Sequence, residues 1–157
     1  MASIINRGPY QFEVAIRKRG FKGISKTFTS KREAQAWAAT IESEMARGVF
    51  VDRTQAERTT FAQLIERYIE EVIPGHRGAA DEIQHLQVIL RSPLAVRRIS
   101  TLSGADFAKF RDDRLQGRGV RKVKPATVVR ELQIVKRLFT TAQREWNIGL
   151  VENPVAH

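Results

Sequence analysis

The chain has 157 residues, enough for one ordinary domain or two small ones, and its 42% hydrophobic content is too high for a disordered chain. Its 27 Lys and Arg residues against 17 Asp and Glu give a formal net charge of +10, which favours a polyanionic partner because each cation set on a phosphate releases a counterion. The absence of cysteine excludes disulfides and thiolate metal sites, and without a signal core or an apolar run near the ~20 residues of a membrane span, a cytoplasmic location is expected.

The first part of the chain alternates apolar and polar residues. Phe12, Val14 and Ile16 fall at every second position, a period typical of a strand with one buried face. Glycine-containing turns separate this strand from two others, which we predict over residues 2–6 and 24–28.

A helical period follows the third predicted strand. Ser30 and Glu33 fit a capping box, and Gly48 provides a C-terminal stop signal. The apolar stripe between them consists of Ala34, Trp37, Ala38, Ile41 and Met45. Because three strands alone cannot bury an apolar face in water, we expect this helix to lie across the sheet.

The remainder of the chain is predicted to be helical after a polar, aperiodic linker at residues 51–58. The starting signals of the helices are Thr60 with Gln63, residue 79, Ser103 with Asp106, and Pro125. The sequence therefore predicts an α+β fold. A small three-stranded antiparallel sheet packed on one helix occupies residues 1–50, and an all-α bundle of four to five helices occupies residues 59–157.

No catalytic arrangement is apparent in the sequence. The three histidines lack metal-ligand spacing, and the phosphate-binding patterns GxxxxGKS/T and GxGxxG are absent. The carboxylate pairs at 70–71 and 112–113 stand among arginines in predicted helices, which favours local ion pairs on a solvated face over acid–base catalysis. We expect no cofactor and no metal ion.

The basic residues of the first fifty positions gather around the turn between the second and third strands. Strand alternation leaves polar side chains on the face away from the helix, and such a face can enter the major groove and reach base edges. A solvated sheet face with a basic hairpin tip is the alternative. The expected base-reading residues are Gln11, Glu13, Arg17, Ser25 and Thr27. The expected phosphate-binding residues are Lys18, Arg19, Lys22 and Lys26.

A second basic surface is predicted at the loop before the last helix and along that helix, opposite its apolar stripe. The helix N-terminus also presents free N–H groups, which suit a phosphate. A solvated face is again the alternative. The expected phosphate-binding residues here are Arg118, Lys122, Lys124, Thr127, Arg130 and Arg137. Residues 1–50 and 59–157 each carry a net charge of +5, so each part could bind its own stretch of phosphates.

Two stretches resemble the tyrosine recombinases, the phage-type integrases. SKTFTSKREAQAWAATIESEM resembles the strand–turn–helix of their small arm-site-binding domain, and ATVVRELQIVKRLFTTAQREW, followed by ENP, is similar to the last long helix and exit turn of their SAM-like core-binding domain. The two occur in the family's order, and the resemblance covers essentially the whole chain.

The resemblance implies that the sheet binds arm-type DNA through the major groove and that the bundle forms half of a clamp on the crossover site. The implied partner is double-stranded DNA in the bacterial cytoplasm and nucleoid, with self-association on DNA through the parent recombinase. In the family a C-terminal domain supplies catalytic arginines, a lysine, histidines and a tyrosine nucleophile. That set is not carried over, because Tyr10 starts a strand, Tyr68 lies on an apolar helical face, and neither is expected to have activating Arg and His neighbours. We therefore expect a non-catalytic N-terminal portion of a site-specific recombinase, ending at ENPVAH where the catalytic domain would begin.

Two rival functions are kept open. One is a stand-alone DNA-binding regulator whose sheet resembles a plant-type AP2 reader and whose bundle mediates dimerisation. The other is an RNA-binding structural protein, for which the sequence lacks aromatic residues interleaved with the basic face to stack bases.

Overall fold

In the computed structural model, which describes residues 1–156, the first fifty residues contain a three-stranded antiparallel sheet with strand order β1-β2-β3. The strands are β1 (Ala2–Gly8), β2 (Gln11–Ile16) and β3 (Ile24–Phe28). Val14 lies opposite Ile4 on one side and Lys26 on the other, so these three residues share one face of the sheet. Each predicted strand is present, with small differences at its ends.

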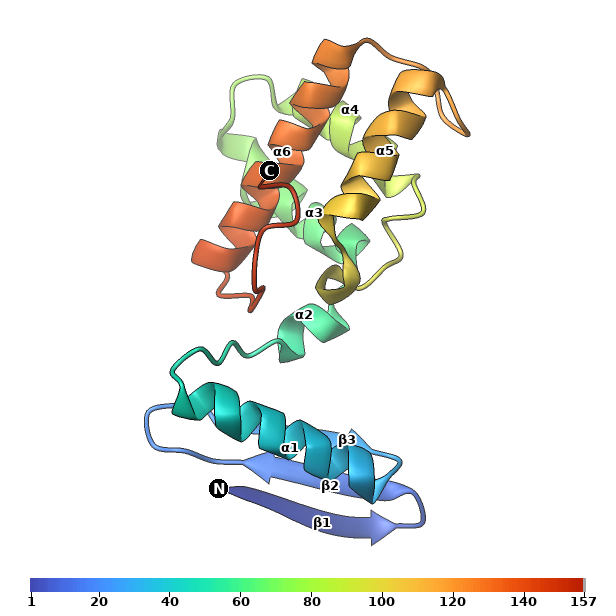
Figure 1. Ribbon diagram of the computed structural model, residues 1–157. Helices are drawn as coiled ribbons and strands as arrows, with labels where there is room; N and C mark the ends of the chain where they lie inside the picture. Colours follow the sequence, from blue (N-terminus) through green and yellow to red (C-terminus); the bar gives the residue numbers. More distant parts are fainter. Residues whose placement is uncertain (157) are drawn as a thin grey trace. The chain divides into compact units, whose positions relative to one another are not determined.

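Helix α1 (Lys31–Ala46) lies across that face, as the sequence predicts (Figure 1). Val14 and Ile16 are fully buried beneath it, and the rings of Phe28 and Trp37 approach to 5.5 Å between centroids. Of the two bonds in the predicted capping box, one is found in the described residues: the Glu33 N–H donates to Ser30 Oγ at 3.5 Å. Gly48 follows the last turn with φ of +71°, a conformation that favours glycine.

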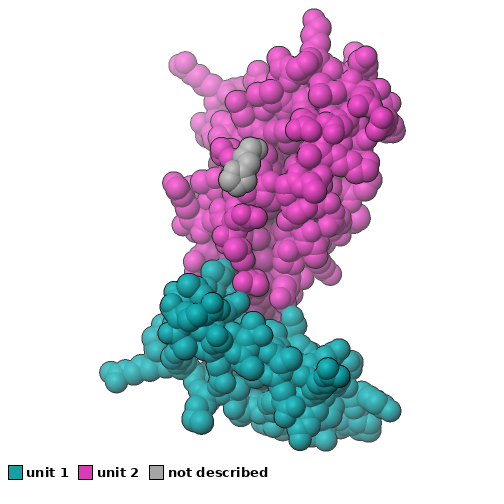
Figure 2. All heavy atoms as spheres, viewed as in Figure 1, with its two compact units in different colours: residues 1–52 teal, residues 53–157 magenta. Residues whose placement is uncertain are grey.

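The rest of the chain folds into α2 (Thr54–Arg58), α3 (Phe61–Glu71), the 3-10 turn η1 (Ile73–Gly75), α4 (Ala79–Leu90), the 3-10 turn η2 (Ile99–Thr101), α5 (Gly104–Gln116) and α6 (Pro125–Arg144). The chain thus divides into two compact units, residues 1–52 and 53–157 (Figure 2). The predicted α+β class is confirmed. No helix within residues 1–156 is long and apolar enough to span a membrane.

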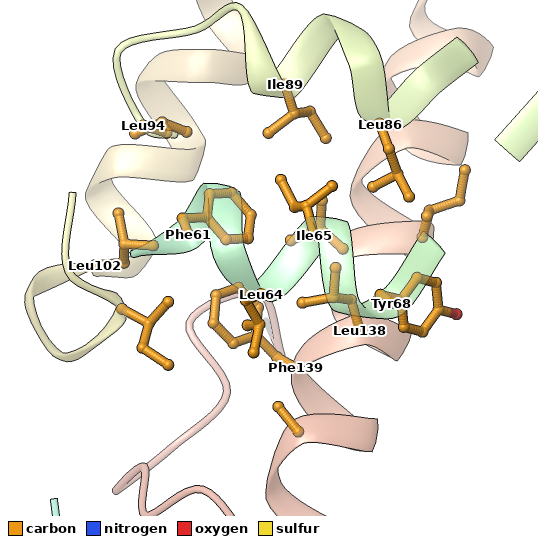
Figure 3. Packing of buried hydrophobic residues seen from close by; sticks show 14 of the residues in the cluster. Phe61, Leu64, Ile65, Tyr68, Leu86, Ile89, Leu94, Leu102, Leu138 and Phe139 are labelled. Carbon is orange, nitrogen blue, oxygen red and sulfur yellow. The ribbon is translucent and has the colours of Figure 1, made fainter. Parts of the chain in front are cut away.

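The core of the second unit is built around α3. Phe61, Ile65 and Phe139 are fully buried, and the Phe61 and Phe139 rings stack with centroids 5.4 Å apart (Figure 3). The complete capping box at Thr60 and Gln63 fixes the start of α3, as predicted. The Ser103–Asp106 box likewise opens α5, and Pro125 is the first residue of α6.

The segment expected to be a linker contains the short helix α2. Its Ala56 is fully buried and belongs to the core of the helical unit, while the Arg98 guanidinium donates to the Arg58 carbonyl oxygen. A five-residue helix with one buried alanine has no periodic apolar pattern, which explains why the sequence indicated a linker. Residues 54–58 are therefore part of the helical unit.

Candidate nucleic-acid interface

The sheet presents its expected polar face on the side away from α1. Gln11, Arg17, Ser25 and Thr27 are all exposed. Glu13 is half-buried and forms an ion pair with Arg7 of β1, so this carboxylate already has a cationic partner within the sheet. Four of the five predicted base-reading side chains are thus free to meet a ligand on this face.

The turn between β2 and β3 holds three of the predicted phosphate-binding residues. Lys18, Arg19 and Lys22 are exposed. The Phe21 N–H donates to the Lys18 carbonyl oxygen at 3.1 Å, and Gly20 supplies the φ of +88° that the third position of this turn requires. Sequence reasoning missed Phe21, a half-buried residue within the cationic stretch.

Phe21 secures the turn to the core of the sheet unit. Its ring packs edge-on against Phe50 with centroids 5.9 Å apart, and the Lys18 ammonium lies 5.7 Å from the Phe21 ring centroid. Lys18, Arg19 and Lys22 therefore stand on a turn that the Phe21–Phe50 contact holds against the sheet unit.

Lys26 lies on the other face of the sheet from the predicted base-reading residues. It stands opposite Val14, on the helix-covered side, and its ammonium is 5.9 Å from the Phe28 ring centroid. Strand alternation predicts this position, because successive side chains point to opposite faces and both neighbours, Ser25 and Thr27, lie on the free face. Lys26 is therefore separated from the cations of the turn, and a role in phosphate binding stays a prediction.

The helical unit contains a cationic groove with a volume of about 1020 Å³. Residues of α4 and of the loop that joins α5 to α6, residues 117–124, line it. Its lining includes Gln84, His85, Val88, Arg91, Arg114, Gly119, Val120, Arg121, Lys122, Val123, Lys124, Pro125, Thr127 and Glu131. Three predicted residues, Lys122, Lys124 and Thr127, are thus brought together.

The charges of the α5–α6 loop are available to a ligand. Arg118, Arg121, Lys122 and Lys124 are exposed, and no salt bridge involves any of them within residues 1–156. Arg91, the C-cap of α4, is also exposed and lines the groove. Sequence reasoning missed Arg91 and Gln84, because a polar position on an amphipathic helix gives no sign of which neighbour it will face.

The two remaining predicted residues, Arg130 and Arg137, lie elsewhere. They line a second groove, of about 1010 Å³, and each pairs with a carboxylate from the first turn of α4. Arg130 Nη2 lies 2.5 Å from Asp81, and Arg137 Nη2 lies 2.9 Å from the buried Glu82. The predicted stripe from Thr127 to Arg137 is therefore divided between two grooves.

Replacing these two arginines by alanine is expected to affect stability unequally. Arg130 and Asp81 are 57% and 48% exposed, so losing their pair costs at most about 1 kcal/mol. The Glu82 side chain is only 10% exposed, and removing Arg137 leaves it with His76 alone, which costs about 1–3 kcal/mol. Urea unfolding of the two variants measures the difference, and equal midpoints would contradict this assignment.

Tyr68 has closer polar neighbours than the sequence suggested. The His76 ring lies edge-on to it with centroids 6.4 Å apart, and the charge of Arg137 acts on its phenol. Both of these neighbours, however, are hydrogen-bonded to the Glu82 carboxylate. Burial raises the pKa of the Tyr68 phenol above its ordinary value, and Arg137 offsets only part of this effect. A buried phenol with a raised pKa is a poor nucleophile.

The carboxylate pairs take part in local ion pairs, as predicted. Glu71 binds Arg67, Asp112 binds Arg111 and Asp113 binds Lys109, all at exposed or half-buried positions. Hydrogen bonding to Arg111 lowers the pKa of the Asp112 carboxyl from its ordinary value.

Three relatives connect the chain to DNA recombination. A putative integrase/recombinase of Haemophilus influenzae is 29% identical over all 157 residues, which cover 40% of that protein. A second one from this organism is 32% identical over 88 residues, 56% of this chain and 27% of the relative. A shufflon-specific DNA recombinase of Escherichia coli is 30% identical over 92 residues, 57% of this chain and 24% of the relative.

The chain spans well under half the length of each of these curated relatives. No family model and no solved structure matches it. The names of the relatives do not favour the rival regulator. The resemblance drawn from the sequence is thus confirmed, and the chain is related to the integrases and DNA recombinases over a part of their length.

Proposed function

We propose that this chain binds double-stranded DNA as the non-catalytic N-terminal portion of a site-specific tyrosine recombinase, with an arm-site-binding domain in the first unit, residues 1–52, and a core-binding domain in the second unit, residues 53–157. The observation that carries the proposal is the set of unpaired cations at the cationic groove. Arg121, Lys122 and Lys124 line this groove together with Arg91, and Arg118 stands on the same eight-residue loop. These exposed side chains form a surface suited to a row of phosphates. Attachment-site DNA is the substrate that the recombinase resemblance implies.

The sheet suits a second stretch of DNA. Neighbouring strands lie about 4.8 Å apart, so β2 and β3 together form a ribbon narrow enough for a major groove roughly 12 Å wide. Gln11, Arg17, Ser25 and Thr27 project from the free face of this ribbon. An amide and a guanidinium are the groups that bind adenine and guanine edges in bidentate fashion. The cations at its turn would then hold the flanking phosphates.

Sequence selection with the whole chain tests this assignment. Duplexes enriched by the unaltered chain should differ in base preference from those enriched by the Gln11→Ala variant, because one lost bidentate contact changes base discrimination by about 1–3 kcal/mol. The matched control is Arg19→Ala with Lys22→Ala on the same unit. It should weaken binding to all duplexes and lower the salt slope without changing the preferred sequence. Identical preferences for the Gln11 variant and the unaltered chain would remove the sheet face from base reading, and absence of any duplex binding at low salt would refute the proposed function.

A further inference from the structure

A fully buried ion pair joins α5 to α6 beneath the cationic groove. Arg114 Nε donates to Glu131 Oε2 at 3.0 Å, and Arg114 Nη2 donates to the other carboxylate oxygen. The side chains are 5% and 0% exposed. His85 of α4 stands beside the pair, with Nδ1 3.6 Å from Glu131 Oε1.

Arg114 also holds the α5–α6 loop. Its Nη1 donates to the Arg121 carbonyl oxygen at 2.7 Å, and its own carbonyl oxygen accepts from the Val123 N–H at 3.1 Å. One residue therefore binds Glu131 with two donors and the loop backbone at two points. Arg121 and Lys122 lie at or between those points, and Lys124 follows directly after the second.

Gly117 closes the other end of the loop. Its φ of +73° favours glycine, and a Cβ there would lie 3.1 Å from the Lys122 Cβ. The Arg118 N–H donates to the Asp113 carbonyl oxygen at 3.0 Å. The loop is thus a shaped segment held at both ends, and its cations leave the backbone in set directions.

Stability alone gives a weak reason for such a pair. Burying two charges has a desolvation cost that the attraction between them roughly offsets, and hydrophobic replacements of both partners are often neutral or stabilising. Two apolar side chains could fill the same volume. They could not donate a hydrogen bond to the Arg121 carbonyl oxygen, which lies within the DNA-facing loop.

We propose that the Arg114–Glu131 pair is a positioning device, which fixes the α5–α6 loop so that its cations meet successive phosphates. The inference rests on the proposed DNA binding. Arg114 and Glu131 are positioning residues, because both are buried and act through the loop. Removing both charges should leave the fold intact and loosen the loop, so that fewer phosphates are engaged at once.

The test compares the unaltered chain with the double variant Arg114→Met, Glu131→Leu. The probe is a labelled 30-base-pair duplex of mixed sequence, titrated at several salt concentrations. The matched control is Arg67→Gln with Glu71→Gln. This control also removes one ion pair and keeps the net charge, but its pair is exposed. We expect the buried-pair variant to keep its urea midpoint, to bind at least tenfold more weakly and to lose one to two units of salt slope, while the control matches the unaltered chain.

Three outcomes can be told apart. A folded buried-pair variant with unaltered affinity and slope overturns the positioning role while leaving DNA binding in place. Failure of the unaltered chain to bind the duplex overturns the proposed function, and the inference with it. If the double variant does not fold, hydrogen exchange on the unaltered chain decides: the Val123 amide should be protected, and exchange there at the rate of a free amide overturns the inference.

Discussion

Replacing Arg118, Arg121, Lys122 and Lys124 together by alanine is expected to lower the salt slope of DNA binding by about three to four units. Each phosphate contact contributes about 0.9 to that slope, and these four exposed cations have no salt bridge to a carboxylate within residues 1–156. Over a fourfold rise in salt, a slope difference of that size corresponds to a change in relative affinity of roughly a hundredfold. Fluorescence anisotropy with a duplex of mixed sequence measures it, and no other single change to the chain should alter binding as much.

The control for this variant removes the same amount of charge elsewhere. Arg67, Arg77, Lys109 and Arg111 lie on the helical unit outside the cationic groove, and replacing them by alanine gives the same net charge. If the loop acts by local contact, this second variant should keep most of the slope. Equal losses in the two variants would mean that net charge alone drives binding, and would contradict the groove as an interface.

Phe61→Ala is expected to lower the free energy of unfolding of the helical unit by about 3–5 kcal/mol. The side chain is fully buried, stacks on Phe139 and meets the Phe107 ring edge-on with centroids 5.8 Å apart. Its loss leaves a cavity among large aromatic neighbours that small movements cannot fill. Such a loss is a large part of the stability of a domain of this size.

The two tryptophans allow the effect to be assigned to one unit. Trp37 packs in the sheet unit and Trp146 in the helical unit. In single-tryptophan versions of the chain, Phe61→Ala should shift the urea transition seen by Trp146 and leave that seen by Trp37 unchanged. Val14→Ala is the reciprocal control, because Val14 is fully buried in the sheet unit. Equal shifts of both signals would show that the units unfold together.

Patterns local in sequence predicted most of the fold. The Thr60–Gln63 and Ser103–Asp106 capping boxes, the alternation through β2 and the stop at Gly48 all depend on residues within a few positions of one another. Helix α2 was missed because its only core residue is one alanine, whose burial depends on packing against distant parts of the chain.

The candidate site could be predicted only in part, because charge partners lie far apart in sequence. Arg114 and Glu131 are separated by 17 positions, and each falls on a helix where a charged residue normally indicates a solvated face. Arg137 finds Glu82 across 55 positions. The loop cations could be grouped from the sequence because they are neighbours in it, whereas the arginines of α6 have carboxylate partners that no local pattern reveals.

The carboxylates of Asp81 and Glu82 change the kind of binding that α6 can offer. A phosphate that reaches Arg130 or Arg137 must take the place of an anion that is already bound. Such an exchange releases a carboxylate of the same chain into water, and the lost ion pair offsets part of the energy of the new contact. The loop cations Arg118, Arg121, Lys122 and Lys124, which have no salt bridge to break within residues 1–156, would therefore contribute most of the attraction to any duplex. Arg130 and Arg137 would exchange their carboxylates only for phosphates that fit the guanidinium geometry better than Asp81 and Glu82 do. Helix α6 would thus favour duplexes of a particular backbone shape and add little to non-specific binding.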